Sequence, residues 1–520
     1  MVGEAGGLDG ESPCEAPAFF MEAEEDGEGG LMVDTVLCYE SFHLDAASSL
    51  ATFTYLLLDA QSLVQLDVFT TSLALPAACA AERYASGGAT AAAFAVGMVS
   101  LAWLWVGLPA RTVLVRCKRL DAAECAFWND TLNGCLAEFH QHHGMAPSCI
   151  VVQSAPARIP AATQAGPTSP LQICDRRVLV PMGGGKDSTL VWHLLGRAPP
   201  LPAASITSLT WLYVEDEPGE MQANWRLRTL AALAGDGQVL VATHCWRCPR
   251  WEAARRRRFT SMGHPWAALV CFTSALVACL CGYDAIVVGN ERSAGEGNGM
   301  YRGVAVNHQH DKALAWERGA AAYLARHVSP RLEYFSALSH LWEVQIAARF
   351  WAICPDLLPV ITCCNVQHHG TTRPCAECAK CVFVALLFAG VCEKPTQAWA
   401  HFGCDVLASS CDRVAATAAA LLGRPGTSKP LDCVGTADEA AVCVALARQK
   451  YTAAGIPLPL LLDTPEAVAD AARGARLVGD ITQGCGPHAV PPWAQSIFGA
   501  LPDLFVGPPL PGPCPETGRR

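Results

Sequence analysis

From about residue 177 onward, short apolar runs alternate with longer stretches in which apolar residues recur at helical spacing. The short runs are rich in β-branched residues, as strands are, and lie at 178–180, 209–214, 238–243 and 285–288. The helical stretches between them include 221–233 and 266–280. This β-α-β-α alternation predicts an α/β fold with a doubly wound, mostly parallel sheet, which binds ligands at the carboxyl ends of its strands.

The first third of the chain predicts a second α/β unit, at 36–145. It contains an apolar helix candidate at 88–108, a strand candidate at 112–116 and an amphipathic stretch from Phe127 to Phe139. The helix candidate is long and uncharged enough to cross a membrane. Its many alanines, Gly97, Ser100 and the following Pro109 favour a buried helix that leads into a strand, so we expect no membrane span.

The remaining segments are predicted from composition. We expect an acidic flexible lead at 1–35 and a linker at 146–176, before a nucleotide-binding domain at 177–400. A helical, alanine-rich region follows at 401–475, and a Pro/Gly-rich tail at 476–520. We expect little regular structure from residue 484 onward.

Net charge and cysteine content exclude some classes of protein. A net charge of -11 disfavours a general nucleic-acid binder. The one basic cluster, Arg255–Arg258, is typical of a solvated helix face or a clamp on a phosphorylated small molecule, with RNA contact as the alternative. Twenty-six cysteines in 520 residues fall below the level of a disulfide scaffold. The acidic start of the chain lacks a secretory or transit signal, so we expect a cytoplasmic protein.

A glycine cluster joins the first strand of the alternating region to its helix. Gly183, Gly184 and Gly185 leave main-chain N–H groups free to hold an anion in front of the helix, and Lys186 adds a cation. Asp187 is a candidate magnesium ligand, and Ser188 a donor to phosphate. The Walker and dinucleotide spacings both fail here, because Val180 and Ser188 stand where they require glycine.

A polar, glycine-rich run follows the strand at 285–288, at the same predicted sheet edge. Arg292 is suited to bind phosphate or carboxylate, and Asn290, Glu291 and Ser293 are suited to orient ribose, metal or substrate. His308 and His310 come next and titrate near neutral pH, although histidines in polar loops are often only solvated.

Four cysteines have the spacing of a zinc site. Cys375, Cys378 and Cys381 lie at two-residue gaps, and Cys364 precedes them. Cys363 is an alternative fourth ligand, and His368 or His369 could substitute. Closed four-thiolate sites are structural.

The glycine loop resembles that of the ATP pyrophosphatase (PP-loop) superfamily, although Gly183 stands where the superfamily has serine. With Gly289–Ala294, Val306–His308, the cysteine set and Lys429–Thr436, the chain resembles the UDP-N-acetyl-alpha-D-muramoyl-L-alanyl-L-glutamate epimerases. The resemblance implies a PP-loop fold, a nucleotide-linked peptidoglycan precursor as substrate, ATP, Mg²⁺, structural Zn²⁺ and release of AMP and pyrophosphate.

The resemblance also assigns roles. Residues 183–188 and 290–293 would bind ATP, with Lys186 and Asp187 acting in adenylation of the substrate carboxylate. His308, then His310, then Cys433 are the candidates for proton transfer. Two alternatives stay open: a PP-loop ligase or nucleobase-modifying enzyme such as the deazaguanine nitrile synthase, and a non-catalytic nucleotide-binding scaffold.

Overall fold

The computed structural model describes residues 33–155, 175–197, 205–216, 218–234, 239–246, 265–366 and 373–498. Most of the acidic lead, the centre of the expected linker, Arg255–Arg258, His368, His369 and the end of the tail lie outside these residues.

Within the described residues, ten strands form one sheet in the order β12-β9-β6-β7-β8-β3-β2-β1-β4-β5. The strands in chain order are β1 (Val33–Asp45), β2 (Leu50–Asp59), β3 (Gln65–Ala74), β4 (Ala110–Val115), β5 (Val151–Ser154), β6 (Asp175–Pro181), β7 (Ser205–Glu215), β8 (Val239–Cys245), β9 (Ala285–Val288) and β12 (Glu333–Ser336). A separate hairpin pairs β10 (Gly299–Tyr301) with β11 (Val304–Val306).

The sheet has two halves of different character. Strands β12, β9, β6, β7 and β8 are parallel throughout, in the order of a doubly wound domain. Strands β3, β2 and β1 pair antiparallel, and β3 joins β8. Strands β4 and β5 then extend β1 in parallel. The prediction of an α/β fold with a mostly parallel sheet is confirmed.

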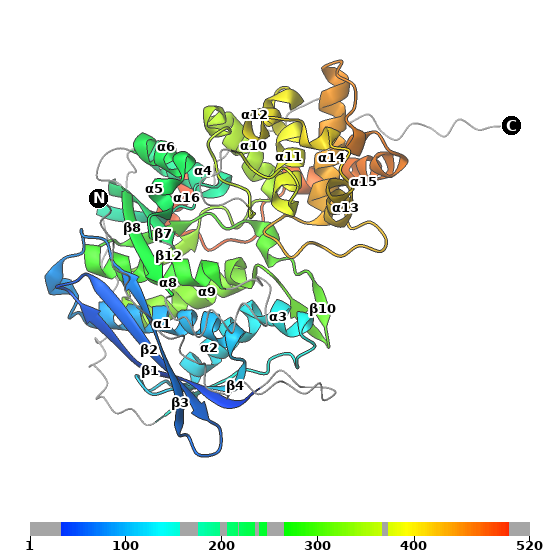
Figure 1. Cartoon of the computed structure of the whole chain (residues 1–520). Coiled ribbons are helices and arrows are strands. Elements are labelled where there is room, and N and C mark those ends of the chain that lie inside the picture. Colours follow the sequence, from blue (N-terminus) through cyan, green and yellow to red (C-terminus); the bar gives the residue numbers. More distant parts are fainter. Residues whose placement is uncertain are drawn as a thin grey trace, which may run out of the picture.

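Helices cover both faces of the sheet and form a further layer at the C-terminal end (Figure 1). They are α1 (Gly87–Gly107), α2 (Ala122–Cys135), α3 (Ala137–His142), α4 (Lys186–Gly196), α5 (Glu220–Ala223), α6 (Trp225–Ala234), α8 (Trp266–Cys281), α9 (Leu314–Tyr323), α10 (Glu343–Ile353), α11 (Ala379–Val391), α12 (Trp399–Phe402), α13 (Asp412–Leu421), α14 (Ala437–Ala453), α15 (Pro465–Thr482) and α16 (Pro492–Phe498).

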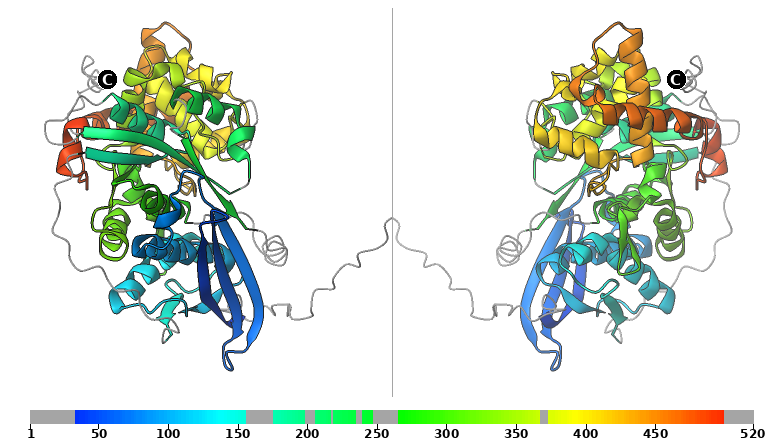
Figure 2. Two further views of the ribbon diagram at one scale, coloured as in Figure 1. Left: turned by 90° about the vertical axis from the view of Figure 1, so that its left-hand side faces the viewer. Right: turned by 90° about the vertical axis from the view of Figure 1, so that its right-hand side faces the viewer.

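Alternate residues of β6 point to opposite faces of the sheet and into two different cores. Leu179 packs with α1, α8 and α9, whereas Val178 and Val180 pack with α4, α10 and α11. Figure 2 shows the long strands β1 to β3 extending beyond the parallel half and the helices α11 to α15 gathered at the opposite end.

Helix α1 is the segment whose length and composition would suit a membrane span. In its most apolar window, 89% of the residues are buried inside the protein. The segment packs against α8 and leads into β4, which confirms the predicted helix and strand. Burial by other parts of the chain therefore accounts for its apolar character.

The expectation of little regular structure after residue 484 is wrong for α16. Trp493 in this helix donates a hydrogen bond to Glu333, with an N···O distance of 2.8 Å, and stacks under Arg176. Phe498 is buried. These tertiary contacts stabilise a helix that local composition does not favour.

Candidate functional site

The glycine loop lies at the carboxyl end of β6, next to β9, where the strand order of the parallel half reverses. Gly184 has φ +77°, a conformation that favours glycine, and Gly185 is the N-cap of α4. Thr362 fixes the loop, because its hydroxyl donates to Gly183 O at 2.6 Å and its N–H donates to Gly184 O at 2.8 Å. The loop thus presents the amino end of α4 to the space in front of it.

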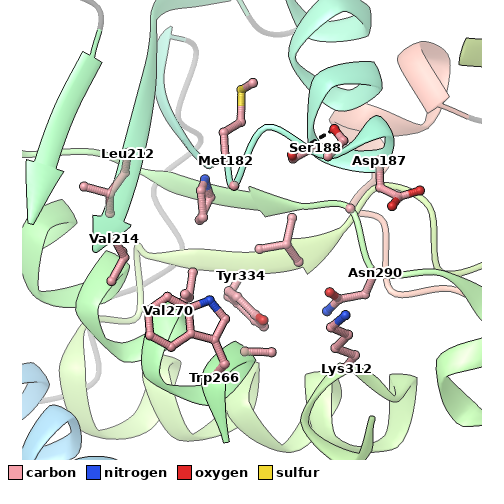
Figure 3. A pocket seen from close by; sticks show the side chains of 16 residues that line it. Met182, Asp187, Ser188, Leu212, Val214, Trp266, Val270, Asn290, Lys312 and Tyr334 are labelled. Carbon is pink, nitrogen blue, oxygen red and sulfur yellow. Dashed lines mark hydrogen bonds between the residues drawn. The ribbon is translucent and has the colours of Figure 1, made fainter. Parts of the chain in front are cut away.

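An open cavity lies in front of this loop. Its volume is about 780 Å³ when the solvent space at its opening is included. Figure 3 shows Leu212, Val214, Trp266 and Val270 on one side of it, and polar groups on the other. The polar side chains are those of Asp187, Ser188, Asn290 and Lys312. The two walls suit a ligand with an apolar ring and an anionic tail.

Gly289 allows the end of β9 to approach the first turn of α4. A Cβ at this position would lie 3.0 Å from the carbonyl carbon of Asp187 and 3.1 Å from its carbonyl oxygen. This close approach brings Asn290 to the same cavity as the glycine loop. Gly289 was not among the predicted site residues.

Lys186 points away from the cavity into the protein. Its Nζ contacts Asp187 Oδ1 at 2.6 Å and pairs with the buried carboxylate of Glu343. Burial lowers the pKa of Lys186, but the two carboxylates raise it more, so it stays above its ordinary value. The ammonium group is therefore a fixed charge behind the loop.

The residues after β9 point mostly inward. Asn290, Glu291 and Ser293 are buried, and in the described part of the chain Asn290 Nδ2, Glu291 Oε1 and Ser293 Oγ have no hydrogen-bond partner. Buried polar atoms are usually hydrogen bonded, so these three atoms are available to a ligand or a water molecule. Arg292 stacks on Trp342, with 4.3 Å from Cζ to the ring centroid.

A second group of charged side chains surrounds Cys433, in the loop before α14. Lys312 lines the cavity and donates from Nζ to Cys433 Sγ at 3.1 Å. His308 is near enough to Cys433 to influence its thiol, and its Nδ1 lies 2.5 Å from Glu138 Oε2. Lys380 donates to the carbonyl oxygen of Cys433. Lys312 therefore links this group to the glycine-loop cavity.

These contacts shift the pKa values of Cys433 and His308. Burial raises the pKa of the Cys433 thiol, but Lys312, His308 and Lys380 outweigh it and place the pKa below its ordinary value. Burial lowers the pKa of His308, but Cys433 and Glu138 together raise it to about 10. Both shifts favour a thiolate beside an imidazolium.

His310 does not join this group. Its ring packs over Gly134 in α2, and its Nε2 lies 3.4 Å from Asp130 Oδ2. The two histidines predicted as alternatives thus occupy different surroundings, and His308 is the one beside Cys433.

The sulfur atoms of Cys364, Cys375, Cys378 and Cys381 all lie within 4.8 Å of one another. The Cys375 and Cys381 sulfurs are 3.8 Å apart, and a tetrahedral zinc site with bonds of about 2.3 Å places sulfurs about 3.8 Å apart. The N–H of Cys378 donates to Cys375 Sγ at 3.3 Å, as suits a thiolate. The geometry and the donor set fit one zinc ion.

Cys363, the alternative fourth ligand, has another partner. Its sulfur lies 2.8 Å from His401 Nε2, and His401 Nδ1 in turn donates to Leu358 O at 2.9 Å. Cys364 is the cysteine grouped with the other three.

Several side chains at the site were not predicted. Lys380 lies between Cys378 and Cys381, and Lys312 follows His310 by two residues, so their position next to selected residues was a usable signal. Glu138, Glu343 and Thr362 come from segments with no motif, and only the fold brings them to the site.

Comparison with known proteins gives consistent matches. A family model described as MurL N-terminal domain matches residues 32–205 and 256–337, and one described as MurL C-terminal domain matches 360–473. UDP-N-acetyl-alpha-D-muramoyl-L-alanyl-L-glutamate epimerase of a Micromonospora species is 31% identical over 61% of this chain and 67% of its own length. The epimerase of Xanthomonas oryzae is 27% identical over 78% of this chain and 83% of its own length. No solved structure matches the chain.

Proposed function

Because the chain belongs to the family of UDP-N-acetyl-alpha-D-muramoyl-L-alanyl-L-glutamate epimerases, we propose that it inverts the terminal glutamate of UDP-MurNAc-L-Ala-L-Glu to the D form. We further propose that ATP drives this step through an acyl-adenylate, with release of AMP and pyrophosphate. The observation that carries the ATP proposal is the glycine loop, whose amides precede α4 at the point where the strand order reverses.

Adenylation solves a chemical problem of the reaction. The α-proton of glutamate lies beside an ionised carboxylate, so its removal would place a carbanion next to negative charge. Converting that carboxylate to a mixed anhydride with AMP removes its charge and lets an enolate-like intermediate form. A general base of ordinary strength can then take the proton.

The cavity offers each part of ATP a matching wall. The apolar wall of Leu212, Val214 and Trp266 would hold the adenine ring, and the amides of the glycine loop would hold the triphosphate. Asp187 faces the cavity and fits as a magnesium ligand; a bound magnesium ion would neutralise phosphate charge. Asn290 Nδ2 and Ser293 Oγ, which have no partner in the described part of the chain, would orient the nucleotide or the substrate carboxylate.

Lys186 and the cysteine site support the cavity from behind. Lys186 places a fixed positive charge at the start of α4 through its pair with Glu343. Zinc held by Cys364, Cys375, Cys378 and Cys381 would cross-link the segment that carries Lys380. Lys380 then holds the backbone of the Cys433 loop.

Cys433 and His308 are the proton-transfer candidates that lie beside the cavity. Lys312 contacts Cys433 and also lines the cavity, so the sulfur is close to the place of the acyl group. His310 is turned toward Asp130 and is the weaker candidate.

The decisive experiment is incubation of the protein with ATP, magnesium and UDP-MurNAc-L-Ala-L-Glu in heavy water. We expect AMP, pyrophosphate and deuterium at the glutamate α-carbon, detected by mass spectrometry and NMR. AMP formation only with a deazaguanine carboxylic acid and ammonia would instead identify a nucleobase-modifying enzyme, which shares the cysteine spacing. Epimerisation without ATP cleavage would refute the acyl-adenylate.

A further inference from the structure

Glu138, His308 and Cys433 form a row of carboxylate, imidazole and thiol beside the cavity. The Nδ1 atom of His308 lies 2.5 Å from Glu138 Oε2, and the ring is also near enough to Cys433 to interact with its thiol. Lys312 contacts the same sulfur at 3.1 Å. A base within reach of a thiol and oriented by a third group is the arrangement that activates cysteines.

Three distant segments of the chain supply this row, and the structure fixes them to one another. Glu138 lies on α3, His308 follows β11, and Cys433 precedes α14. Asn298 accepts a hydrogen bond from the N–H of His308 at 2.9 Å and donates one to Pro430 O at 3.0 Å. The histidine segment and the cysteine loop are therefore held by the same side chain.

The charges in the row alternate. Glu138 contacts His308, and Lys312 contacts Cys433, so each group of the row, when ionised, has a neighbour of opposite sign. The other charged groups that face Cys433 are those of Lys380, Lys429 and Asp432. Removal of the Glu138 charge would weaken the imidazolium and, through it, the thiolate.

The contact between His308 and Cys433 also restricts their roles. An epimerase that uses two bases needs one on each face of the α-carbon. Two neighbouring side chains approach a substrate from the same side, so His308 and Cys433 would act as one unit. The histidine then works through the cysteine.

We propose, on the basis of the epimerase function above, that Cys433 is the thiolate base for one face of the glutamate α-carbon and that Glu138 is the positioning residue that keeps His308 on it. The thiolate takes the α-proton to form S–H, and the electron pair of the C–H bond moves into the acyl-adenylate as an enolate. In the reverse direction the same S–H returns its proton. On the opposite face of the α-carbon, the enolate takes a proton from a group that exchanges its protons with water.

The first test measures the thiol itself. We would follow alkylation of Cys433 by iodoacetamide, resolved by peptide mass spectrometry, from pH 5 to pH 9 in the full-length protein. For Glu138→Gln we expect a pH midpoint about one unit higher and about tenfold slower alkylation near neutral pH. Asp130→Asn is the matched control, because it removes the carboxylate beside His310 and should leave the Cys433 profile unchanged. An unchanged profile in Glu138→Gln would overturn the proposal.

The second test separates proton transfer from adenylation. With ATP and UDP-MurNAc-L-Ala-L-Glu, Glu138→Gln should keep substrate-dependent exchange of labelled pyrophosphate into ATP and lose deuterium incorporation by about a hundredfold. Asp187→Asn should lose pyrophosphate exchange and keep the alkylation profile of Cys433. Full deuterium incorporation by Cys433→Ala would refute the role of the thiolate. If the wild type shows no pyrophosphate exchange, the adenylation is refuted. The alkylation test does not depend on adenylation and would remain valid.

Discussion

Gly183 and Gly184 are neighbours in the loop but differ in what a side chain would meet. A Cβ on Gly184 would lie 2.7 Å from Leu227 Cδ2, and the backbone there is left-handed, whereas a Cβ on Gly183 has nothing within 4 Å. Gly184→Ala should lower the free energy of unfolding by at least about 1–2 kcal/mol and weaken ATP binding, because the strained turn moves the amides. Gly183→Ser should preserve both. Chemical denaturation and calorimetric titration with ATP would check this, and equal losses in the two variants would contradict it.

Glu317 in α9 is a buried carboxyl group whose ionisation opposes folding. Burial raises its pKa to about 7, against smaller lowering effects from the Ser336 backbone and Arg318. Its pKa in the unfolded chain is near 4.5, so the unfolded state releases this proton at lower pH than the folded state. The stability contributed by the protonated group is therefore complete below about pH 4.5 and is lost as pH rises through about 7.

Glu317→Gln should remove this pH dependence. We expect the melting temperature of the wild type to fall relative to that of the variant between pH 5 and pH 8, measured by differential scanning calorimetry. Glu393→Gln serves as the control, because Glu393 is exposed. Its melting temperature should change with pH in the same way as that of the wild type. A constant difference between wild type and Glu317→Gln across this range would show that Glu317 does not titrate there.

At the residue scale, sequence reasoning found groups that are adjacent along the chain. The glycine loop could be predicted because strand, turn and helix follow one another, so residues 183–188 had to share one end of the sheet. The direction of Lys186 could not be predicted, since it depends on Glu343, which lies 157 residues away. Glu138 likewise reaches His308 only through the packing of α3.

Substitutions in the cysteine loop at the start of α11 would show which thiols hold the metal. Cys364→Ser should lower zinc content well below one ion per chain, because the group loses one of its four sulfurs. Cys363→Ser should keep the zinc, because Cys363 lies outside the group of four sulfurs and contacts His401. Elemental analysis of protein purified without chelators would measure both. Zinc loss in Cys363→Ser with retention in Cys364→Ser would reverse the ligand assignment.

Among elements, those with one clear periodicity were predicted and those that depend on long-range pairing were not. The apolar runs of β6 and β9 and the second half of β7 are buried on both faces, which gives continuous hydrophobic stretches. Strands β1 to β3 mix polar and apolar residues, and their stability comes from pairing with one another. No local pattern could show that β3 would join β8 and continue the sheet.

At the scale of the whole molecule, one core joins the N-terminal segment to the parallel half of the sheet. The same apolar cluster contains Phe94 and Trp105 of α1, Phe272 of α8 and Leu179 of β6. Helix α1 packs against α8 and is largely buried. Separation of α1 from α8 would therefore expose a large apolar face on each helix. The two halves should therefore form a single cooperative unit.

This coupling predicts that a chain beginning at Asp175 will not fold independently. Without α1, helix α8 would expose Phe272, Leu269 and Leu276 to solvent, and β8 would lose β3. In the intact protein, we expect the amides of α1 and α8 to show the same opening free energy by hydrogen exchange, and ATP to raise both equally, since ligand binding stabilises the whole folded state. A stable fragment from Asp175 that binds ATP, or faster exchange in α1 alone, would mean that the N-terminal segment is a separable domain and that Glu138 joins His308 only by docking.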